Sequence, residues 1–202
     1  MVGSANPQSA ILAAREQRAA RTRQFLDRLR LPTIVLTINA PGPNKNAPWV
    51  ARVMAQGTAA IRNTLDEQGF VVYDAASCES AAGPEWRGAV QSRSSTAAYP
   101  GKSDHDPHAA RAQYQRGDDN VGGVDPAALT LKRLTVGIEE SHRLGRLFDI
   151  DVFIHTPTPL GRTALGLAAR RCLVCDRPAH ECVRSRRHRL PELYAKIATL
   201  VE

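Results

Sequence analysis

Two aspartates lie two residues apart in a short apolar segment, Phe148-Asp149-Ile150-Asp151-Val152. Successive side chains of a strand point to opposite faces, so Asp149 and Asp151 would share one face and the apolar residues the other. Two carboxylates this close repel each other unless a cation lies between them, and Mg²⁺ prefers one or two carboxylates together with phosphate oxygens. The pattern predicts a magnesium-dependent phosphoryl-type transferase, in which one aspartate could also accept the proton of an attacking hydroxyl. The alternative is that this Asp-x-Asp pair only caps a turn.

Two further segments carry groups suited to phosphate. His142 and Arg146 precede the aspartates, and both residue types can contact phosphate oxygens or developing charge. The turn at residues 39–46 lies between an apolar run and a helical pattern, where α/β proteins commonly bind phosphate. In this turn Gly42 would let the backbone approach a ligand, and Lys45 would supply a positive charge. A rigid structural turn is the alternative, since the Gly-Lys-Ser/Thr ending of a Walker motif is absent.

A third group of residues has metal-ligand spacing. Cys172, Cys175, Cys182 and His188 follow the pattern C-x2-C-x6-C-x5-H, with His180 as a competing fourth ligand. Three thiolates and one imidazole make a tetrahedral Zn²⁺ site, so the spacing predicts structural zinc. A packed cluster of reduced cysteines is the alternative. Both interpretations fit a reducing compartment better than a disulfide framework does.

The cysteine segment is rich in positive charge. Its arginines are Arg162, Arg170, Arg171, Arg177, Arg184, Arg186, Arg187 and Arg189. They could receive several phosphates or an acidic protein, and nucleic acid is the competing partner class. Few aromatic residues are interleaved with them, which argues against a base-stacking surface. The whole chain has the same bias, with a net charge of +7 and a pI near 9.7.

These chemical groups need a folded frame, and 202 residues with 43% hydrophobic content can build one sizeable core. We therefore expect residues 1–202 to form a single domain, with residues 162–190 as a basic Cys/His segment within it. The chain contains no apolar run of about 18 residues and no apolar signal core near its N-terminus. A soluble cytoplasmic protein is the expectation.

Periodicity predicts the elements of this domain. Helices are expected over residues 9–30, 48–68, from 125 and from 191, and strands over residues 33–39, 70–73 and around the aspartates. The order strand, helix, strand implies an α/β or α+β core. The arginines of the first helix are expected on a solvated face. Between residues 84 and 123 the apolar periodicity disappears, which predicts a mobile insertion.

With these residues in place, the chain resembles the CitX family, the holo-acyl-carrier-protein synthases of citrate lyase. The matching blocks are residues 40–45, 142–152 and 170–175, the last running on to Cys182 and His188. The resemblance implies transfer of 2'-(5''-phosphoribosyl)-3'-dephospho-CoA from its 5''-triphosphoribosyl donor to a serine of the acyl-carrier (gamma) subunit of citrate lyase. Diphosphate is the expected leaving group.

The resemblance also implies a nucleotidyltransferase-like mixed sheet flanked by helices, with a small basic cysteine-containing lobe at the C-terminus. Asp149 and Asp151 would then hold Mg²⁺, and the remaining basic surface would receive an acidic carrier. The expected donor-binding residues are Gly42, Lys45, His142, Arg146, Arg170 and Arg171. The chain departs from the family pattern in its long polar segment at 84–123 and in residues 166–169, which replace a proline-containing approach to the paired arginines.

Three other functions compete with this interpretation. One is a zinc-knuckle nucleic-acid-binding protein that uses the arginine segment. Another is the equivalent transferase acting on the carrier of malonate decarboxylase, and the third is nucleotidylation of a small acceptor.

Overall fold

The computed structural model describes residues 6–94, 126–154 and 156–202. Its helices are α1 (Pro7–Leu29), α2 (Pro48–Glu67), α4 (Pro126–Ser141), α5 (Ala179–Arg184) and α6 (Leu190–Val201), and its strands are β1 (Thr33–Ile38), β2 (Phe70–Cys78), β3 (Glu85–Ser92) and β4 (Phe148–Phe153). Short 3-10 turns lie at Gly145–Leu147 and Arg162–Leu165. None of the described helices combines the length and the hydropathy that a bilayer crossing requires.

The four strands form one sheet in the order β2-β3-β1-β4. The expected sheet flanked by helices is confirmed, and all three strand pairings are antiparallel, as in α+β architectures. β1 runs through the middle because its β-branched and leucine residues suit a strand that is buried on both faces. It pairs with β4 so that Thr37 lies opposite Asp149 and Val35 opposite Asp151.

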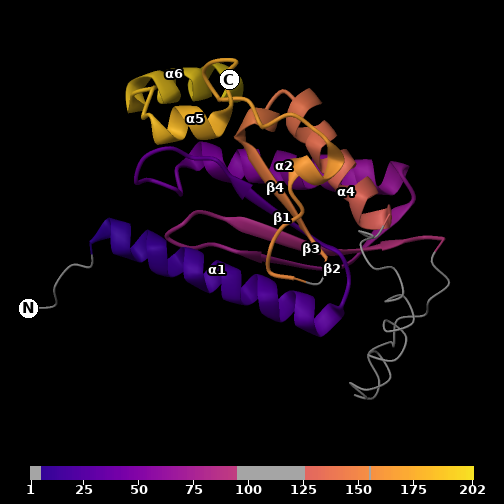
Figure 1. Ribbon diagram of the computed structural model, residues 1–202. Coiled ribbons are helices and arrows are strands. Elements are labelled where there is room, and N and C mark those ends of the chain that lie inside the picture. The colour runs from indigo at the N-terminus through magenta and orange to yellow at the C-terminus, as the bar shows by residue number, and fades with distance from the viewer. Residues whose placement is uncertain (1–5, 95–125, 155) are drawn as a thin grey trace, which may run out of the picture.

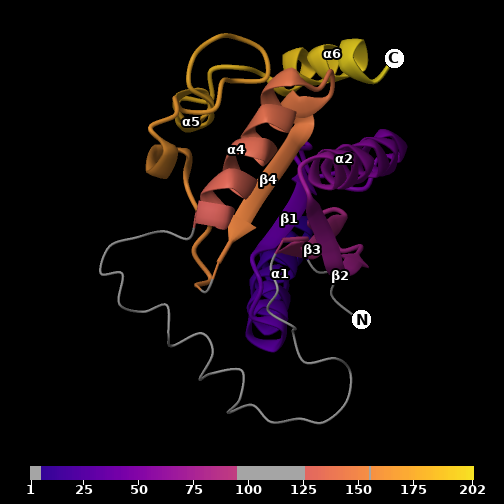
Figure 2. The same ribbon diagram turned by 90° about the vertical axis from the view of Figure 1, so that its right-hand side faces the viewer.

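Helices cover both faces of the sheet (Figures 1 and 2). α2 and α4 pack on the face that carries the main core, which includes Ile34, Leu36 and Phe148. α2 turns the buried stripe Val50, Val53, Gly57, Ile61 and Leu65 toward the sheet, and the partly buried Met54 packs beside it. Apolar residues of α1 pack on the other face, where Phe25 belongs to one hydrophobic cluster with Ala89 and Leu26 belongs to another with Val35 and Phe153.

β3 corrects the prediction of a mobile insertion over residues 84–123. Glu85–Ser92 is a strand between β2 and β1, and its first six residues are buried. The sequence predicted a loop here because Glu85 and Arg87 are charged, but in the fold the two residues are buried and pair with each other. Gly88 leaves the space that the indole of Trp86 occupies. The rest of the expected insertion, from residue 95 onward, lies outside the described residues, as does Asp125.

The C-terminal lobe consists of residues 170–189 and α6. An antiparallel bridge joins Arg171 to Pro178, and the Cys172 amide donates to the Arg177 carbonyl at 2.7 Å. These bonds fold residues 170–179 into a tight hairpin that α5 follows. α6 begins at Leu190, one residue before the predicted start at Pro191, and buries Ile197 against the main core.

Candidate functional site

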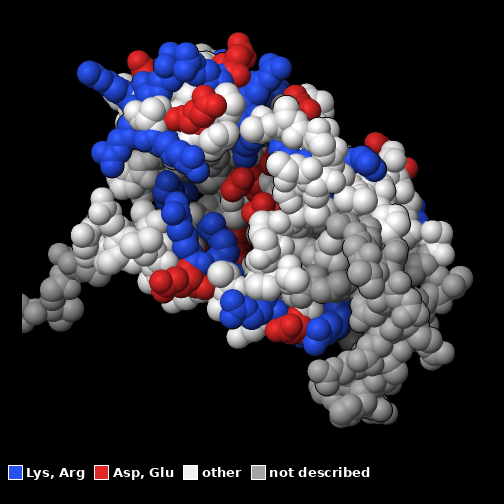
Figure 3. Space-filling model, in the orientation of Figure 1, with Lys and Arg blue, Asp and Glu red and all other residues white. Residues whose placement is uncertain are grey.

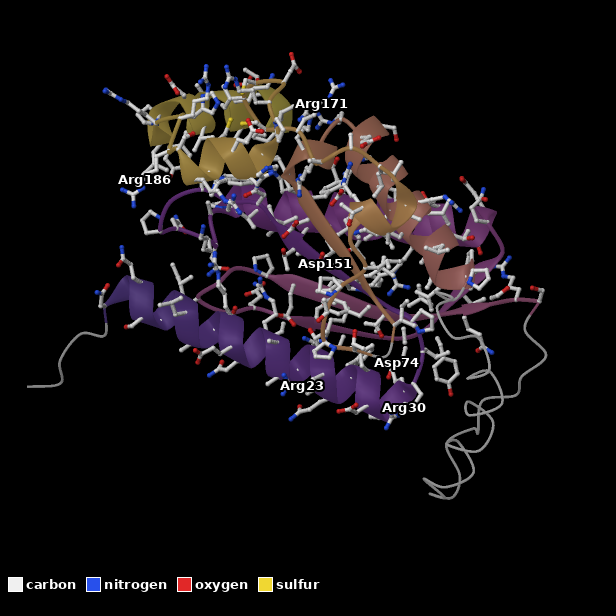
Figure 4. The ribbon with its side chains drawn as sticks, in the orientation of Figure 1. Arg23, Arg30, Asp74, Asp151, Arg171 and Arg186 are labelled. Carbon is white, nitrogen blue, oxygen red and sulfur yellow. The ribbon has the colours of Figure 1, made fainter. Side chains whose placement is uncertain are left out.

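The two aspartates occupy the predicted positions on β4. Phe148, Ile150 and Val152 are at most 1% exposed in the core, whereas the Asp149 side chain is 54% exposed and Asp151 is half-buried on the α1 side of the sheet (Figure 4). Burial, and then repulsion by Asp149, raises the pKa of Asp151 to about 6. A partly desolvated carboxylate beside a second carboxylate favours a cation, so the pair suits a hard divalent ion.

Side chains close the outer edge of β4. Among the strands that the structure describes, only β1 pairs with β4, so the other backbone groups of β4 need different partners. Both backbone groups of Ile150 have side-chain partners. Its carbonyl accepts from Lys132 Nζ at 3.1 Å, and its amide donates to Glu139 Oε1 at 2.9 Å. Arg170 donates to the carbonyl of Phe148, two residues before Ile150 on the same strand. This edge network fixes the strand that carries the aspartates.

A basic cavity of about 350 Å³ opens beside Asp149. It lies between the end of β1, the start of β4, the cysteine hairpin and α5, and its lining residues are Asn39, Arg146, Asp149, Arg170, Arg171, Leu173, Ala179, His180, Val183 and Arg184. We call it the arginine pocket. It brings together four of the residues predicted from the sequence, and it adds His180 and Arg184, which the sequence offered only as a competing metal ligand and as one arginine among eight.

The arginines of the pocket differ in how firmly they are held. Arg146 donates to the Cys172 carbonyl at 2.7 Å, which ties the β4 turn to the hairpin. Arg170 donates to Asp149 Oδ1 at 3.1 Å and to the Arg146 carbonyl at 2.8 Å, and its side chain is 21% exposed. Arg171 is 68% exposed and lies 3.7 Å from Asp176, which is 91% exposed. Arg146 and Arg170 thus shape the pocket, while Arg171 is free to meet a ligand.

The turn after β1 has a packing role in the structure. Gly42 has a φ of +75°, and the Tyr194 hydroxyl of α6 occupies the space where a side chain at Gly42 would lie. Tyr194 donates to the Pro41 carbonyl at 3.3 Å, and Lys45 Nζ donates to the Ala40 carbonyl. Burial, and then the charge of Arg15, lowers the pKa of Lys45. Neither Gly42 nor Lys45 is among the residues that line the arginine pocket.

His142 lies on the other side of the sheet from the aspartates. Its ring packs on Phe148, with 5.0 Å between centroids, and the Phe148 side chain belongs to the core between the sheet and α2. Its Nδ1 accepts from the Leu144 amide at 3.1 Å. Burial, and then Arg143, lowers the pKa of His142. The structure therefore gives His142 a turn-stabilising contact and does not bring it into the arginine pocket.

The predicted zinc ligands come together. The ligand atoms of Cys172, Cys175, Cys182 and His188 all lie within 4.8 Å of one another, so the group could hold a metal ion. His180 lines the arginine pocket instead of joining them. His188 Nε2 faces Cys175 Sγ, and His188 Nδ1 lies 3.5 Å from Glu192. A carboxylate next to the second ring nitrogen is common for metal-bound histidines, because it orients the ring.

The thiols themselves also suit a metal. Burial, and then hydrogen bonds with the Cys175 and Cys172 thiols, raises the pKa of Cys182 to about 11. Burial acts in the same direction on Cys172, but hydrogen bonds from the backbone of Cys175 and Val174 outweigh it and lower the pKa of Cys172. A second thiolate in this cluster needs a cation beside it, which a tetrahedral metal supplies.

Two arginines of α1 complete the surroundings of the aspartates, and the sequence prediction misplaced them. They were expected on a solvated face, but Arg18 and Arg21 point to the sheet and pair with Glu85 at 2.9 and 3.0 Å. The sequence did contain a signal for this orientation: Arg18 and Arg21 follow Ala14 and precede Phe25 at intervals of three or four residues, which places all four on one face of the helix. Figure 3 shows acidic atoms inside a hollow, with basic side chains on its rim.

The chain was compared with known proteins. It matches the CitX family, described as apo-citrate lyase phosphoribosyl-dephospho-CoA transferase, over residues 8–99 and 101–202. Relatives that carry the same description include proteins of Escherichia coli O1:K1 / APEC, Citrobacter koseri and Shigella boydii serotype 18. Each is 30% identical to this chain over 191 residues, which cover 95% of this chain and 86% of the relative.

Proposed function

The chain belongs to the CitX family of apo-citrate lyase phosphoribosyl-dephospho-CoA transferases, and from this membership we propose how its residues carry out the transfer. The enzyme attaches the phosphoribosyl-dephospho-CoA group to the carrier protein of apo-citrate lyase. In our proposal the donor is the 5''-triphosphoribosyl form. A serine Oγ of the carrier attacks the phosphorus nearest the ribose, the bond from that phosphorus to the next bridging oxygen breaks, and diphosphate leaves.

Asp149 and Asp151 are the proposed reaction centre. Their carboxylates share one face of β4, and they are the residues that would hold Mg²⁺. When bound, Mg²⁺ would neutralise phosphate charge during the displacement. Asp151, whose pKa is raised to about 6 by burial and by Asp149, is the better candidate to accept the serine proton near neutral pH.

The observation that carries this proposal is the arginine pocket next to Asp149. Arg146, Arg170, Arg171 and Arg184 line one cavity with that carboxylate. Guanidinium groups form strong, bidentate hydrogen bonds to phosphate oxygens, so this cavity suits the two phosphates that leave as diphosphate. His142 lies across the sheet and Gly42 packs under Tyr194, so in this proposal both residues support the fold of the site.

We further propose that the metal of the Cys172/Cys175/Cys182/His188 group is Zn²⁺ with a structural role. Three thiolates, one imidazole and no open ligand position are typical of structural zinc. The hairpin that carries Cys172 and Cys175 also carries Arg170 and Arg171, and Arg146 donates to the Cys172 carbonyl. The metal would therefore stabilise the wall of the arginine pocket. In the same proposal, residues 1–202 form one transferase domain of which this basic segment is a part.

Substitution of each aspartate tests the reaction centre. Asp149→Asn and Asp151→Asn should each reduce the rate of mass gain of purified apo-carrier, incubated with the triphosphoribosyl donor, by about 100-fold or more. Asp27→Asn is the matched control, because Asp27 is an exposed aspartate of α1 that does not line the arginine pocket. A normal rate for both β4 variants would refute their role, and an inactive wild type would refute the proposed donor or acceptor.

The same assay separates the competing functions. Offering the carrier of malonate decarboxylase beside that of citrate lyase identifies the preferred acceptor. A nucleic-acid-binding protein would instead bind random oligonucleotides with strong salt dependence and would add no mass to either carrier.

A further inference from the structure

α1 contributes arginines to the face that it packs against the sheet. Ala14, Thr22 and Phe25 are at most 6% exposed, and Arg18 and Arg21 fall between them at helical spacing. Their side chains are only 19% and 26% exposed. Charged residues within a buried stripe are rare unless they have partners of opposite charge, so Arg18 and Arg21 need anions beside them.

The anion that the described residues supply is a single carboxylate. Glu85, 1% exposed, accepts from Arg18, Arg21 and Arg87. Three guanidinium groups thus share one negative charge, and the Nε atoms of Arg21 and Arg87 are buried without an acceptor among the described residues. The cluster has more hydrogen-bond donors and more positive charge than its own acidic residue can satisfy.

This basic cluster continues toward Asp149. Burial lowers the pKa of Arg18, the charges of Arg15 and Arg21 lower it further, and Asp149 acts in the opposite direction. The charge of Arg15 also lowers the pKa of Lys45. We name Arg15, Arg18, Arg21, Lys45 and Arg87 the α1 row. Thr37 lies opposite Glu85 in β3 and opposite Asp149 in β4, so Glu85, with its arginines, and Asp149 lie on the same face of the sheet. Asp149 also lines the arginine pocket.

The proposed donor carries two separate polyphosphates, and the site offers two separate basic regions. We infer that the α1 row binds the diphosphate bridge of the dephospho-CoA part of the donor, while the arginine pocket binds the triphosphate end. This inference rests on the proposed function. The bond that breaks belongs to the triphosphate, which must therefore lie at Asp149 and its pocket. Two riboses separate the diphosphate bridge from the triphosphate, so the bridge needs a second binding place beyond Asp149.

Direct binding of two fragments tests the assignment without turnover. Dephospho-CoA carries the diphosphate bridge alone, and inorganic tripolyphosphate imitates the other end of the donor. Arg18→Gln should weaken dephospho-CoA binding in titration calorimetry about tenfold and change tripolyphosphate binding less than about twofold. Arg171→Gln should produce the reverse pattern. Arg23→Gln, an exposed arginine on the opposite side of α1 (Figure 4), should change neither affinity.

A second variant guards against loss of the fold, because Arg18 pairs with buried Glu85. Arg15 is exposed and is not one of the three partners of Glu85, so Arg15→Gln should weaken dephospho-CoA binding in a protein with a normal melting temperature. The inference is overturned if both α1 variants bind dephospho-CoA normally, or if they weaken both fragments equally. It is also overturned if they raise only the KM for the carrier, which would make the α1 row a carrier contact. Fragment binding with no transfer by the wild type would refute the proposed function while leaving this inference standing.

Discussion

At Asp151, burial and a neighbouring carboxylate act together on one group. The raised pKa of about 6, against an ordinary value of 3.8, means that folding favours the protonated form. The resulting penalty on stability is absent below about pH 4, grows as the pH rises toward 6 and is complete above it. In the folded protein without a bound cation, Asp151 is thus a destabilising group at neutral pH.

Asp151→Asn should therefore stabilise the protein in magnesium-free buffer at about pH 7.5. The upper limit is about 3 kcal/mol, since one pKa unit corresponds to about 1.4 kcal/mol. The gain should fall toward zero near pH 4 in urea unfolding experiments. Asp149→Asn should give a smaller gain, because it removes only the second-largest cause of the shift. A difference that does not depend on pH would contradict this account of Asp151.

The conformation and packing of Gly42 predict how a substitution in the turn after β1 changes stability. Gly42→Ala places a methyl group against the Tyr194 hydroxyl at a φ of +75°, so we expect a loss of about 2 kcal/mol in the free energy of unfolding. Gly69→Ala is the matched control, since Gly69 has a φ of +74° but nothing within 4 Å of the added methyl group. It should lose only about 1 kcal/mol from backbone strain.

The contact can be separated from the strain in one further step. Adding Tyr194→Phe to Gly42→Ala removes the oxygen that the methyl group meets. The double variant should recover the part of the loss that exceeds the Gly69→Ala value. No recovery would mean that the docking of α6 on this turn does not depend on the Tyr194 hydroxyl.

At the scale of elements, the edge of β4 depends on one buried carboxylate. Glu139, 6% exposed, accepts from the Ile150 amide and pairs with Arg162 at 2.6 Å. Glu139→Gln keeps the size of the side chain but removes the buried one of the two carboxylates that pair with Arg162, so we expect a loss of about 3 kcal/mol in the free energy of unfolding.

Glu140 supplies the control for this edge. It binds the same Arg162 at 2.6 Å, but its side chain is 64% exposed. Glu140→Gln should cost less than about 1 kcal/mol because solvent screens the pair. Equal losses for the two variants would mean that burial of the Glu139 carboxylate does not matter to the edge of the sheet.

The cysteine lobe depends on a metal in our proposal. The wild type purified without chelator should contain about one equivalent of zinc, and Cys175→Ser should contain much less. Residues 170–189 of this variant should be cut faster by protease, because the hairpin loses its anchor. Cys78→Ser, which changes the cysteine outside the ligand group, should retain its zinc. A wild type without zinc would favour the cluster of reduced thiols.

The elements also differ in how readily the sequence revealed them. β4 and the cysteine hairpin were predictable because their groups lie within a few residues of one another. Alternation predicted the shared face of Asp149 and Asp151, and spacing identified the three cysteines and the histidine that come together. β3 was missed because Glu85 and Arg87 are charged in sequence and neutralise each other only after folding. The pairing of Arg18 with Glu85 joins residues far apart in the chain, and no local pattern carries it.

At the scale of the whole molecule, positive charge gathers around the site and on the C-terminal lobe. Exposed arginines of the lobe are Arg171, Arg177, Arg184, Arg186, Arg187 and Arg189, and Figure 3 shows basic side chains crowding this end of the molecule. Val183, 76% exposed, lines the mouth of the arginine pocket among them. In our proposal the carrier serine approaches Asp149 across this surface, and the net charge of +7 should assist the approach of an acidic carrier.

This arrangement predicts a salt-dependent encounter followed by a less salt-dependent reaction. Raising NaCl from about 50 to about 300 mM should raise the KM for the carrier roughly tenfold and change kcat less than about twofold, because screening acts on exposed charges more than on partly buried ones. Arg187→Glu should raise the KM at low salt and reduce its salt dependence. Arg23→Glu makes the same change of charge on the far side of α1 and should leave KM nearly unaltered (Figure 4). If both variants shift KM equally, net charge alone attracts the carrier and the lobe is not its docking surface.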